Sequence, residues 1–362
     1  MSTYDIGILG GGLAGMSTAL ECTRKGVSVL LIDPNGIAGG ASGTPLGLVN
    51  PATGRFASLS WRSGLCFEAI TENLKLAQAQ SSKTFYKRTG VLRPAQNGDI
   101  AVKMKKNSET QSWPDQWNQW LNCDQVKTIN TEVHCVDGGV WIPVGLTVNI
   151  KEYLSALYHI LKKKDVGFCL QPYAYTLNQD KTWTISPAEP SPAASFTCSK
   201  LITCSGVSAS EMPEWNTLPL IPVKGQCATF STSQYDYDHA ISASGYVSSL
   251  ADDFFVMGST YEHRFDSMLP DDKGKAYLEQ RLSTVIPALY SRSSVQEMWA
   301  GVRASTPNRM PVLGRHPEIE TLFLYTGLGS KGMLYSAYLS RLLMEFIEFE
   351  QELPAEVSIL RF

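Results

Sequence analysis

The sequence has little charge and lacks the patterns that metal-binding, disulfide-rich and membrane-spanning proteins need. Only 18% of its 362 residues are charged, and 31 basic side chains against 34 acidic ones give a net charge of −3. Without a basic stripe, this balance argues against binding a nucleic acid through its phosphates. The eight cysteines fall at irregular spacings with no C-x-x-C pair, so the sequence supports neither a zinc site nor a disulfide framework. No apolar run approaches the length of a membrane-spanning helix.

These absences leave an ordinary globular protein. The hydrophobic fraction of 43% over this length is enough for two hydrophobic cores. A strand-like run already begins at Tyr4, which leaves no room for a secretory leader before it. We therefore expect a cytoplasmic protein with reduced cysteines, no bound metal and no contact with a membrane. The sequence does not indicate an oligomeric state.

Glycine, in contrast, is plentiful and gathers in turns. An apolar run from 4 to 9 reads as a buried strand, and a G-x-G-x-x-G turn follows it and opens a helix. A second apolar run, 27 to 32, ends at Asp33. In a dinucleotide-binding βαβ unit the glycine amides approach a pyrophosphate and such an acid binds a ribose hydroxyl. The glycines of this turn are Gly10, Gly12 and Gly15, and Gly26 is expected to cap the helix.

A similar turn stands near the other end of the chain. An apolar run from 322 to 325 is followed by Gly327, Gly329 and Gly332 and then by a helical pattern. This turn also suits an anion, because a helix N-terminus carries partial positive charge. The segment 36 to 54, GIAGGASGTPLGLVNPATG, is too rich in glycine and too uninterrupted by charge for a surface linker. We expect it to face a ligand as well.

The remaining patterns predict two domains woven together. Helices are expected at 61–79 and 148–161, strands at 167–178 and 182–186, and a mobile hairpin tip at 187–195. Short runs rich in β-branched and aromatic residues at 218–230 and 252–262 indicate an antiparallel sheet. We predict an α/β protein in which a Rossmann-like domain (1–84, 145–215 and 300–362) is interwoven with an α+β substrate domain built on an antiparallel sheet (85–144 and 216–299).

Five motifs in order carry a family resemblance over nearly the whole chain: GILGGGLAG, GGASG, PVKGQ, WAGVRASTPNRMPVLGRHPE and GLGSKGML. Together they resemble the D-amino-acid oxidase superfamily of flavoproteins, which includes glycine oxidase, sarcosine oxidase and the FAD domain of the bifunctional tRNA enzyme for 5-methylaminomethyl-2-thiouridine. The resemblance implies an FAD-dependent oxidoreductase and explains the two turns. One would hold the pyrophosphate, and the other would meet the O2 edge of the flavin, which becomes anionic on reduction.

The resemblance also assigns roles around FAD. Asp33 would bind the adenosine ribose, Ser42 a phosphate, Leu46 to Leu48 the isoalloxazine ring, and the backbone of Ala174 the adenine. Binding would be non-covalent, because sarcosine oxidase-like members attach the flavin through a late cysteine and this chain has none after Cys227. The full set of residues expected to contact FAD is Gly10, Gly12, Leu13, Ala14, Gly15, Asp33, Pro34, Gly40, Ala41, Ser42, Leu46, Gly47, Leu48, Ala174, Ser205, Gly206, Arg303, Gly327, Gly329, Ser330, Lys331, Gly332 and Met333.

The family oxidises the C–N bond of an amine by hydride transfer to flavin N5, water hydrolyses the imine, and O2 reoxidises the flavin. Arg303 stands where glycine oxidase-like sequences carry the arginine that pairs the substrate carboxylate; the alternative is a structural arginine. Four other residues are expected near the substrate: Lys224, Tyr246, Tyr261 and Lys331. Lys224 either faces the substrate or pairs with an acid on the sheet, and Lys331 is placed to put positive charge near the reduced ring.

The substrate is less defined than the reaction. We expect a small amino acid or secondary amine. The stretch SGYVSSLADDFFVMGSTYEHRFD and the cation at Lys331 look more like the tRNA-modifying domain. The first alternative is therefore removal of the carboxymethyl group from a carboxymethylaminomethyl-uridine in tRNA, and tRNA stays open as a partner although the charge balance disfavours it. The second alternative is an FAD-binding subunit without turnover.

Non-covalent binding of FAD leads to a simple prediction. Acid precipitation of the purified yellow protein is expected to release the colour into the supernatant, because no cysteine is available after Cys227 to hold the flavin. Absorption spectra of supernatant and pellet, with mass spectrometry of the released ligand, measure this. Colour that stays with the pellet would contradict the prediction, as would a colourless protein that titrates with NAD.

Overall fold

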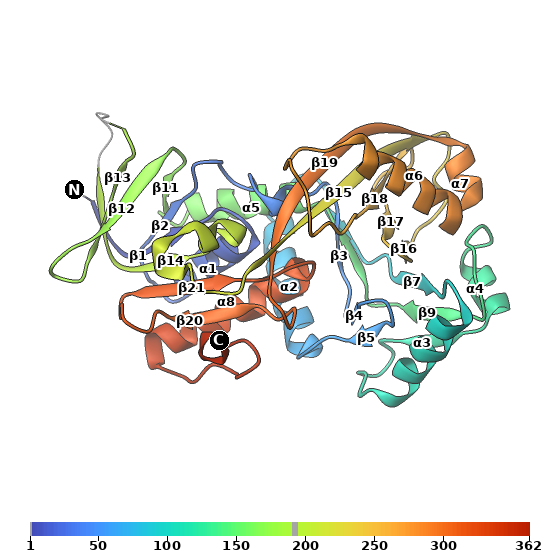
Figure 1. The fold of residues 1–362 in the computed structure, drawn as a ribbon, viewed down its shortest axis with the longest axis horizontal. Coiled ribbons are helices and arrows are strands. Elements are labelled where there is room, and N and C mark those ends of the chain that lie inside the picture. Colours follow the sequence, from blue (N-terminus) through green and yellow to red (C-terminus); the bar gives the residue numbers. More distant parts are fainter. Residues whose placement is uncertain (1, 190–194) are drawn as a thin grey trace.

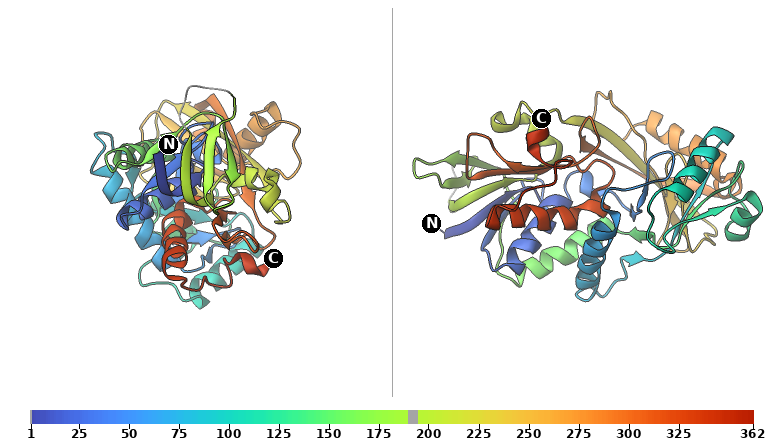
Figure 2. Two further views of the ribbon diagram at one scale, coloured as in Figure 1. Left: turned by 90° about the vertical axis from the view of Figure 1, so that its left-hand side faces the viewer. Right: turned by 90° about the horizontal axis from the view of Figure 1, so that it is seen from below.

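The computed structural model describes residues 2–189 and 195–362, and two large sheets organise it. Figure 1 shows a sheet with parallel strands toward the N-terminus and a second, mostly antiparallel sheet at the far end of the molecule. Figure 2 shows the same arrangement end-on and from below. The expected α/β class with an antiparallel second sheet is confirmed. Residues 190–194, the centre of the expected hairpin tip, lie outside the described residues.

The first sheet has a parallel centre with the strand order β11, β2, β1, β14 and β21. Antiparallel strands extend the sheet beyond β14: β13 and β12 lie beside the first half of β14, and β20 pairs with β21, which lies beside the second half. The bounds are β1 (Ser2–Leu9), β2 (Val29–Ile32), β11 (Gly167–Cys169), β12 (Tyr173–Leu177), β13 (Trp183–Pro187), β14 (Phe196–Thr203), β20 (Val312–Arg315) and β21 (Leu322–Thr326).

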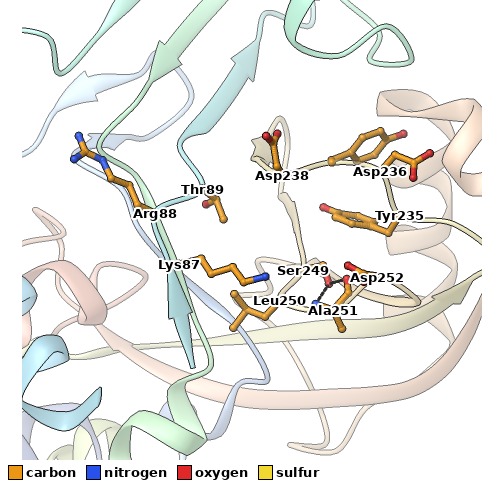
Figure 3. A pocket seen from close by; sticks show the side chains of 11 residues that line it. Lys87, Arg88, Thr89, Tyr235, Asp236, Asp238, Ser249, Leu250, Ala251 and Asp252 are labelled. Carbon is orange, nitrogen blue, oxygen red and sulfur yellow. Dashed lines mark hydrogen bonds between the residues drawn. The ribbon is translucent and has the colours of Figure 1, made fainter. Parts of the chain in front are cut away.

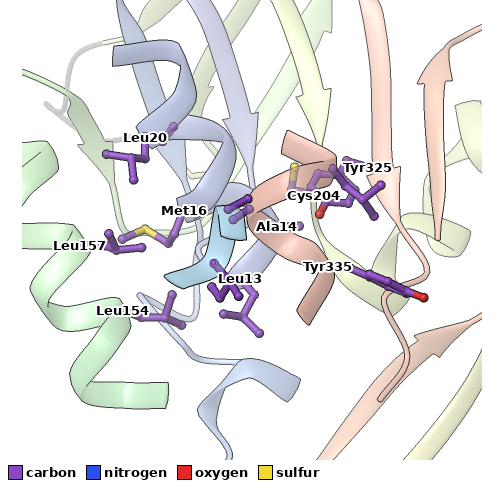
Figure 4. Packing of buried hydrophobic residues seen from close by; sticks show 14 of the residues in the cluster. Leu13, Ala14, Met16, Leu20, Leu154, Leu157, Cys204, Tyr325 and Tyr335 are labelled. Atoms are coloured by element: carbon purple, nitrogen blue, oxygen red, sulfur yellow. The ribbon is translucent and has the colours of Figure 1, made fainter. Parts of the chain in front are cut away.

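Both faces of this sheet are buried, as its unbroken apolar strands require. Ile6 and Ile8 of β1 pack with the helices on one face, while Leu9 packs on the opposite face with Trp215. Figure 4 shows part of the helical side, with Leu13 and Met16 beside Leu154 and Leu157. The helices of this side are α1 (Leu13–Arg24), α2 (Ser63–Gln78), α5 (Ile150–Lys162) and α8 (Gly332–Phe349), and the short turns η2 (Gly206–Glu211) and η3 (Pro213–Trp215) lie on the other.

The second sheet runs in the order β19, β15, β18, β17, β16, β7, β9, β8, and its neighbours are antiparallel except for β16 and β7. Along the chain, helices α6 and α7 come after β18, and helices α3 and α4 come directly before and after β8. All four helices lie at the end of the molecule that holds the second sheet (Figure 1). The bounds are β7 (Val91–Pro94), α3 (Gly98–Thr110), β8 (Gln119–Leu121), α4 (Cys123–Ile129), β9 (Gly139–Ile142), β15 (Ile221–Thr232), β16 (Ala240–Ser242), β17 (Tyr246–Ser248), β18 (Phe254–Gly258), α6 (Asp272–Val285), α7 (Pro287–Ser291) and β19 (Ser293–Ser305).

Two features join the sheets. The long strands β15 and β19 pair from Ile221 and Ser305 at one end to Thr232 and Ser293 at the other, and this ribbon runs from the first sheet into the second. A small sheet of β3, β10 and β6 lies between them. The remaining bounds are η1 (Ala41–Gly43), β3 (Gly47–Val49), β4 (Ala52–Thr53), β5 (Ser58–Leu59), β6 (Tyr86–Lys87), β10 (Leu146–Val148) and η4 (Ile359–Arg361).

Local signals explain where elements begin and end. Gly26 has a positive φ of 73° just after α1, which confirms its role as the helix cap. The expected helix at 61–79 begins only at Ser63, because Arg62 adopts a left-handed conformation. The expected single strand at 167–178 is wrong: it is two strands, β11 parallel to β2 and β12 antiparallel to β13. Pro172 stands between them, and proline has no amide to continue a strand ladder.

None of the helices in residues 2–189 and 195–362 combines the length and the apolar character needed to cross a membrane.

Candidate functional site

The turn after β1 depends on glycine for steric reasons. Gly10 has a φ of 119°, and a side chain there would overlap the backbone carbonyl of Cys204 at the end of β14. A side chain at Gly15 would overlap the carbonyl oxygen of Gly10, so the third glycine lets α1 pack directly against the turn. Ser205 and Gly206 follow β14 at the same place, and a Cβ at Gly10 would lie 3.1 Å from the Ser205 nitrogen.

The start of α1 presents unpaired backbone donors. The amide of Leu13 donates to Oγ of Ser42, at 3.0 Å. Among the described residues, none accepts a hydrogen bond from the amides of Gly12, Ala14 and Gly15. Free amides at a helix N-terminus form a binding site for a phosphate. Ser42 reaches this place from η1, and Gly40, just before it, has open space where a side chain would stand.

Asp33 lies at the end of β2 beside this turn. Its two carboxylate oxygens accept hydrogen bonds from the amides of Gly11, at 2.7 Å, and Asn35, at 2.8 Å. These bonds fix the carboxylate and leave further lone pairs for a hydroxyl. Tyr173 lies near it: burial and then the charge of Asp33 raise the pKa of Tyr173 to about 12. Ala174, the expected adenine contact, is the exposed next residue of β12, and Pro34 follows Asp33 in the turn.

The second glycine turn opens α8 close to the first. Gly327 and Gly329 have positive φ values of 77° and 52°. The amide of Gly329 donates to the Ala304 carbonyl, but no described residue accepts from the amides of Gly332 and Met333. A Cβ at Gly332 would lie 3.0 Å from the side chain of Leu13, so the two helices begin side by side. Ser330 is exposed at this turn.

The glycine-rich segment lies between these helix starts and the β15–β19 ribbon. A Cβ at Gly47 would lie 3.3 Å from the Met333 side chain and 2.6 Å from Ile150. A Cβ at Gly301, on β19, would lie 3.0 Å from Cα of Ala41. Leu46 is buried with Cys227 and Val256, and Leu48 is partly buried against a separate cluster that includes Ala52 and Val91. The structure therefore brings together the expected phosphate, ring and substrate segments, which are far apart in the sequence.

These observations fit FAD. The cofactor needs donors for a pyrophosphate, an acceptor for a ribose, a slot for its ring and donors for the ring's O2 edge. The unpaired amides of α1, with Ser42, supply donors for the pyrophosphate, and the Asp33 carboxylate supplies the acceptor for the ribose. The 46–48 segment provides the slot for the ring, and the unpaired amides of α8 provide donors for its O2 edge. The contacts of individual residues with FAD remain predictions.

Arg303 stands on the β19 side of this arrangement with an unused donor. Its guanidinium crosses the strand pair over Gly225, where any side chain would overlap it. Nη2 donates to Oγ of Ser259 at 2.5 Å, and the guanidinium carbon is 5.9 Å from the centre of the Tyr261 ring. Nη1 is buried and has no hydrogen-bond partner among the described residues. No carboxylate of these residues forms an ion pair with Arg303.

Tyr246 connects the substrate side to the ring segment. Its hydroxyl donates to the carbonyl of Leu46 at 2.6 Å and lies 3.8 Å from Sγ of Cys227. Burial raises the pKa of the Tyr246 phenol, the neighbouring Cys227 adds to this effect, and the charge of Arg303 acts weakly in the opposite direction. Tyr261 is 48% exposed and stands at the outer side of Arg303.

Lys224 does not join this group. Successive residues of a strand point to opposite faces, so Lys224 and Gln226 face away from Gly225 and Arg303. The Lys224 ammonium, 1% exposed, pairs with Asp271 at 2.7 Å, and this contact lowers the pKa of Asp271 to about 2. Of the two roles expected for Lys224, the structure shows the ion pair with an acid on the face opposite Arg303.

Lys331 precedes the first residue of α8. Its ammonium lies 5.1 Å from the centre of the Tyr335 ring, and no carboxylate of the described residues pairs with it. Burial lowers the pKa of Lys331, and the neighbouring Arg309 adds a smaller effect in the same direction. The position suits the expected positive charge at the flavin edge.

Sequence reasoning missed several residues of the site. Gly225 makes room for the guanidinium, Ser259 fixes it, Tyr173 stands by Asp33, and Trp299 packs against Leu46 and Tyr246. The glycine in PVKGQ was a usable signal, because a glycine inside a strand often marks a close approach. Nothing local in the sequence pointed to Ser259.

A cavity of about 580 Å³ lies elsewhere, in the second part of the molecule. Figure 3 shows Lys87 extending across it toward Ser249 and Asp252, with Tyr235, Asp236 and Asp238 along another wall. None of the expected site residues lines it.

Two alanine substitutions separate the fold of the first turn from its binding role. Gly12 has ordinary extended dihedral angles, and a Cβ there would lie 2.9 Å from the rotatable Oγ of Ser42. Gly12→Ala should therefore fold normally but bind FAD at least about tenfold more weakly, because the methyl group takes space beside the free amides. Gly15→Ala should also lower the free energy of unfolding of the apoprotein by about 1–3 kcal/mol, because its Cβ overlaps the backbone.

Titration of each apoprotein with FAD, followed by flavin fluorescence, measures the affinity, and thermal unfolding measures the stability. If Gly12→Ala binds FAD as tightly as the unaltered protein, the phosphates do not lie at this turn.

The comparisons with known proteins agree with this geometry. Residues 5–346 match the family described as FAD dependent oxidoreductase. Among curated proteins, the bifunctional protein MnmC of tRNA 5-methylaminomethyl-2-thiouridine biosynthesis from Leptospira interrogans is 23% identical over 99% of this chain, and MnmC from Thiobacillus denitrificans is 24% identical over 98%. The chain spans only 59% and 58% of the length of these relatives.

Solved structures show the same fold. Glycine oxidase from Geobacillus kaustophilus is similar over 100% of both chains, with a TM-score of 0.87 and 18% identity. Iminodiacetate oxidase from Chelativorans sp. BNC1 is similar over 97% of both chains, with a TM-score of 0.77 and 20% identity. With a family match over nearly its whole length and two glycine turns shaped for the cofactor, this chain belongs to the FAD dependent oxidoreductases of the D-amino-acid oxidase type.

Proposed function

We propose that this oxidoreductase acts on the C–N bond of a small amino acid or carboxylate-bearing secondary amine. The observation that carries the proposal is the buried, unpartnered Nη1 of Arg303. A buried donor without an acceptor costs about 1–3 kcal/mol, so such a group indicates a ligand that supplies one. A carboxylate is the acceptor that a guanidinium binds best, through two parallel hydrogen bonds.

The surroundings of Arg303 prepare it for this task. Ser259 holds Nη2 and so fixes the plane of the guanidinium, while Gly225 leaves the space in which it lies. The hydroxyl of Tyr246 donates to the carbonyl of Leu46 and so ties the 46–48 segment to β17, and its oxygen can still accept a hydrogen bond from a substrate. Tyr261 covers the outer side and limits access of water.

FAD, when bound, supplies the hydride acceptor for the amine-bearing carbon. The amides of Gly332 and Met333 would hold the pyrimidine edge of the flavin, where they would stabilise negative charge, and Lys331 would add a positive charge nearby. Among similar structures, glycine oxidase and iminodiacetate oxidase are named for small amino acids and as oxidases. Their names support a substrate of this size, O2 as the final acceptor and release of an imine to hydrolysis.

A second candidate function is oxidation of a tRNA-borne amine. It is favoured by the curated relatives, which are named for tRNA modification and match 99% of this chain. The candidate reaction removes the carboxymethyl group of a carboxymethylaminomethyl-uridine, and Arg303 would hold the same carboxylate. The net charge of −3 argues against it, because contacts with phosphates dominate affinity for RNA. The third candidate is an FAD-binding subunit without turnover. It does not explain why Arg303 holds a buried donor without a partner among the described residues.

Anaerobic reduction of the flavin distinguishes these functions. We expect N-substituted glycines and other small amino acids to bleach the flavin absorption faster than tRNA carrying the carboxymethylaminomethyl group, because the chain has few basic residues to hold RNA. Reduction by the modified tRNA alone would establish the second candidate. Bound FAD that no amine of either kind reduces would favour the third.

Substitution of Arg303 tests the carboxylate clamp. Loss of one partner of a desolvated, hydrogen-bonded ion pair costs on the order of 2–5 kcal/mol, so Arg303→Ala should lower kcat/KM for an amino acid by roughly a hundredfold or more. Arg303→Lys should recover only part of this, because a point charge does not replace the planar fork. Steady-state kinetics with parallel measurement of FAD content gives both numbers.

Two controls keep the result specific. An amine without a carboxylate should lose little activity on Arg303→Ala, since it never used the clamp. Gly225→Ala keeps the arginine but displaces its guanidinium, so it should show the same selective loss for the carboxylate substrate. If Arg303→Ala retains its flavin and slows both substrates equally, Arg303 is structural.

A further inference from the structure

The eight cysteines form two groups. Six are buried, and two, Cys123 and Cys135, are half-buried. The sulfur atoms of these two lie 2.6 Å apart, although they are twelve positions apart in the sequence. All eight are free thiols in the structure.

The chain on both sides holds this pair in place. Cys123 is the first residue of α4, and Cys135 lies in the segment that follows this helix and packs against the core of the second sheet. The amide of His134 donates to the carbonyl of Val285 at 2.8 Å, and that of Val136 donates to the carbonyl of Ala95 at 3.1 Å. Because the two sulfurs are already in contact and hydrogen bonds hold the backbone beside Cys135, a bond between them needs only a small movement.

The segment enclosed by the pair supports a wall of the cavity in Figure 3. Asn130 bonds the ring of His239 at 3.2 Å. Glu132 pairs with Arg292 at 2.9 and 3.0 Å and accepts a hydrogen bond from the hydroxyl of Tyr237. Tyr237 lines the cavity, and His239 follows it by two residues. Whatever fixes the segment from 123 to 135 therefore also fixes this wall.

We propose that Cys123 and Cys135 are an oxidation site at which a peroxide forms a reversible disulfide that locks this segment. The Cys123 sulfur, as thiolate, attacks a peroxide oxygen, the O–O bond breaks, and hydroxide leaves a sulfenic acid behind. The Cys135 sulfur loses its proton to hydroxide and displaces the sulfenic oxygen as a second hydroxide, which takes up the proton first released by Cys123. In total two thiols and one hydrogen peroxide give one disulfide and two waters.

The order of the two steps follows from burial. Burial, together with contact with Cys123, raises the pKa of the Cys135 thiol to about 12, so Cys135 does not react first. It acts only once the sulfenic acid is formed beside it. The site is independent of the proposed substrate, because it needs neither FAD nor turnover.

Trypsin makes the bond easy to detect. Lys127 lies between the two cysteines, so cleavage after Lys106, Lys127 and Lys151 puts Cys123 in the peptide 107–127 and Cys135 in the peptide 128–151, with no other cysteine in either. The holoprotein is first reduced and freed of reductant, then treated with stoichiometric hydrogen peroxide, alkylated and digested. We expect the two peptides to appear linked, lighter by two hydrogen atoms than their sum, and to separate after treatment with dithiothreitol.

The other cysteines and two variants are the controls. The six buried cysteines should stay reduced in the same sample. Cys123→Ser and Cys135→Ser should each abolish the linked peptides, and both lie outside the flavin site. Sulfinic acid on either cysteine without a link, or a link that forms only in urea-unfolded protein, would overturn the proposal.

Hydrogen exchange tests the consequence for the cavity wall. In oxidised protein the amides of 129–136 and 235–239 should exchange several-fold more slowly than in reduced protein, because a cross-link limits local opening. Peroxide-treated Cys123→Ser should show no such slowing. A linked protein whose exchange at 235–239 is unchanged would show that the bond does not brace the wall.

Discussion

The close packing of α1 against α8 is the constraint on which the rest of the structure depends. Small polar residues line this contact, and the hydroxyls of Thr18 and Ser340 meet across it at 3.1 Å, both fully buried. Because the helices approach so closely, their first turns open at one edge of the parallel sheet, where Gly332 faces Leu13. Two sets of unpaired amides, from opposite ends of the chain, thus lie close together, as the proposed binding of one FAD requires.

The proposed substrate site is built from strands and not from helix N-termini. The ribbon of β15 and β19 is long and rigid, and it carries Arg303 at the end that returns to the first sheet. Residues that contact Arg303 come from two places in the chain: Gly225 lies on β15, and Ser259 and Tyr261 lie just after β18. A buried donor without a hydrogen-bond partner costs free energy until a ligand provides an acceptor. Such a donor is therefore preorganised to bind that ligand.

Whether a feature could be predicted from the sequence depends on how far apart along the chain the interacting residues lie. The glycine turns, the Asp33 acid and the cap at Gly26 are local features, and the sequence showed each of them. The break at Pro172 was also local, and its signal was overlooked. The face on which Lys224 lies, the Ser259 contact and the pairing of Cys123 with Cys135 depend on register and on segments distant in sequence. No motif in one sequence encodes them.

The alternation along β15 shows how tightly the two faces are tied together. Lys224 and Gln226 both form hydrogen bonds with Asp271, directly before α6. Gly225, between them, leaves space for the guanidinium of Arg303. An insertion or deletion of a single residue before this point would exchange the faces. It would bury an ammonium against the flavin side and drive a guanidinium into a side chain. The length of the chain leading into β15, more than any one side chain on it, therefore determines which residue of β15 faces Arg303.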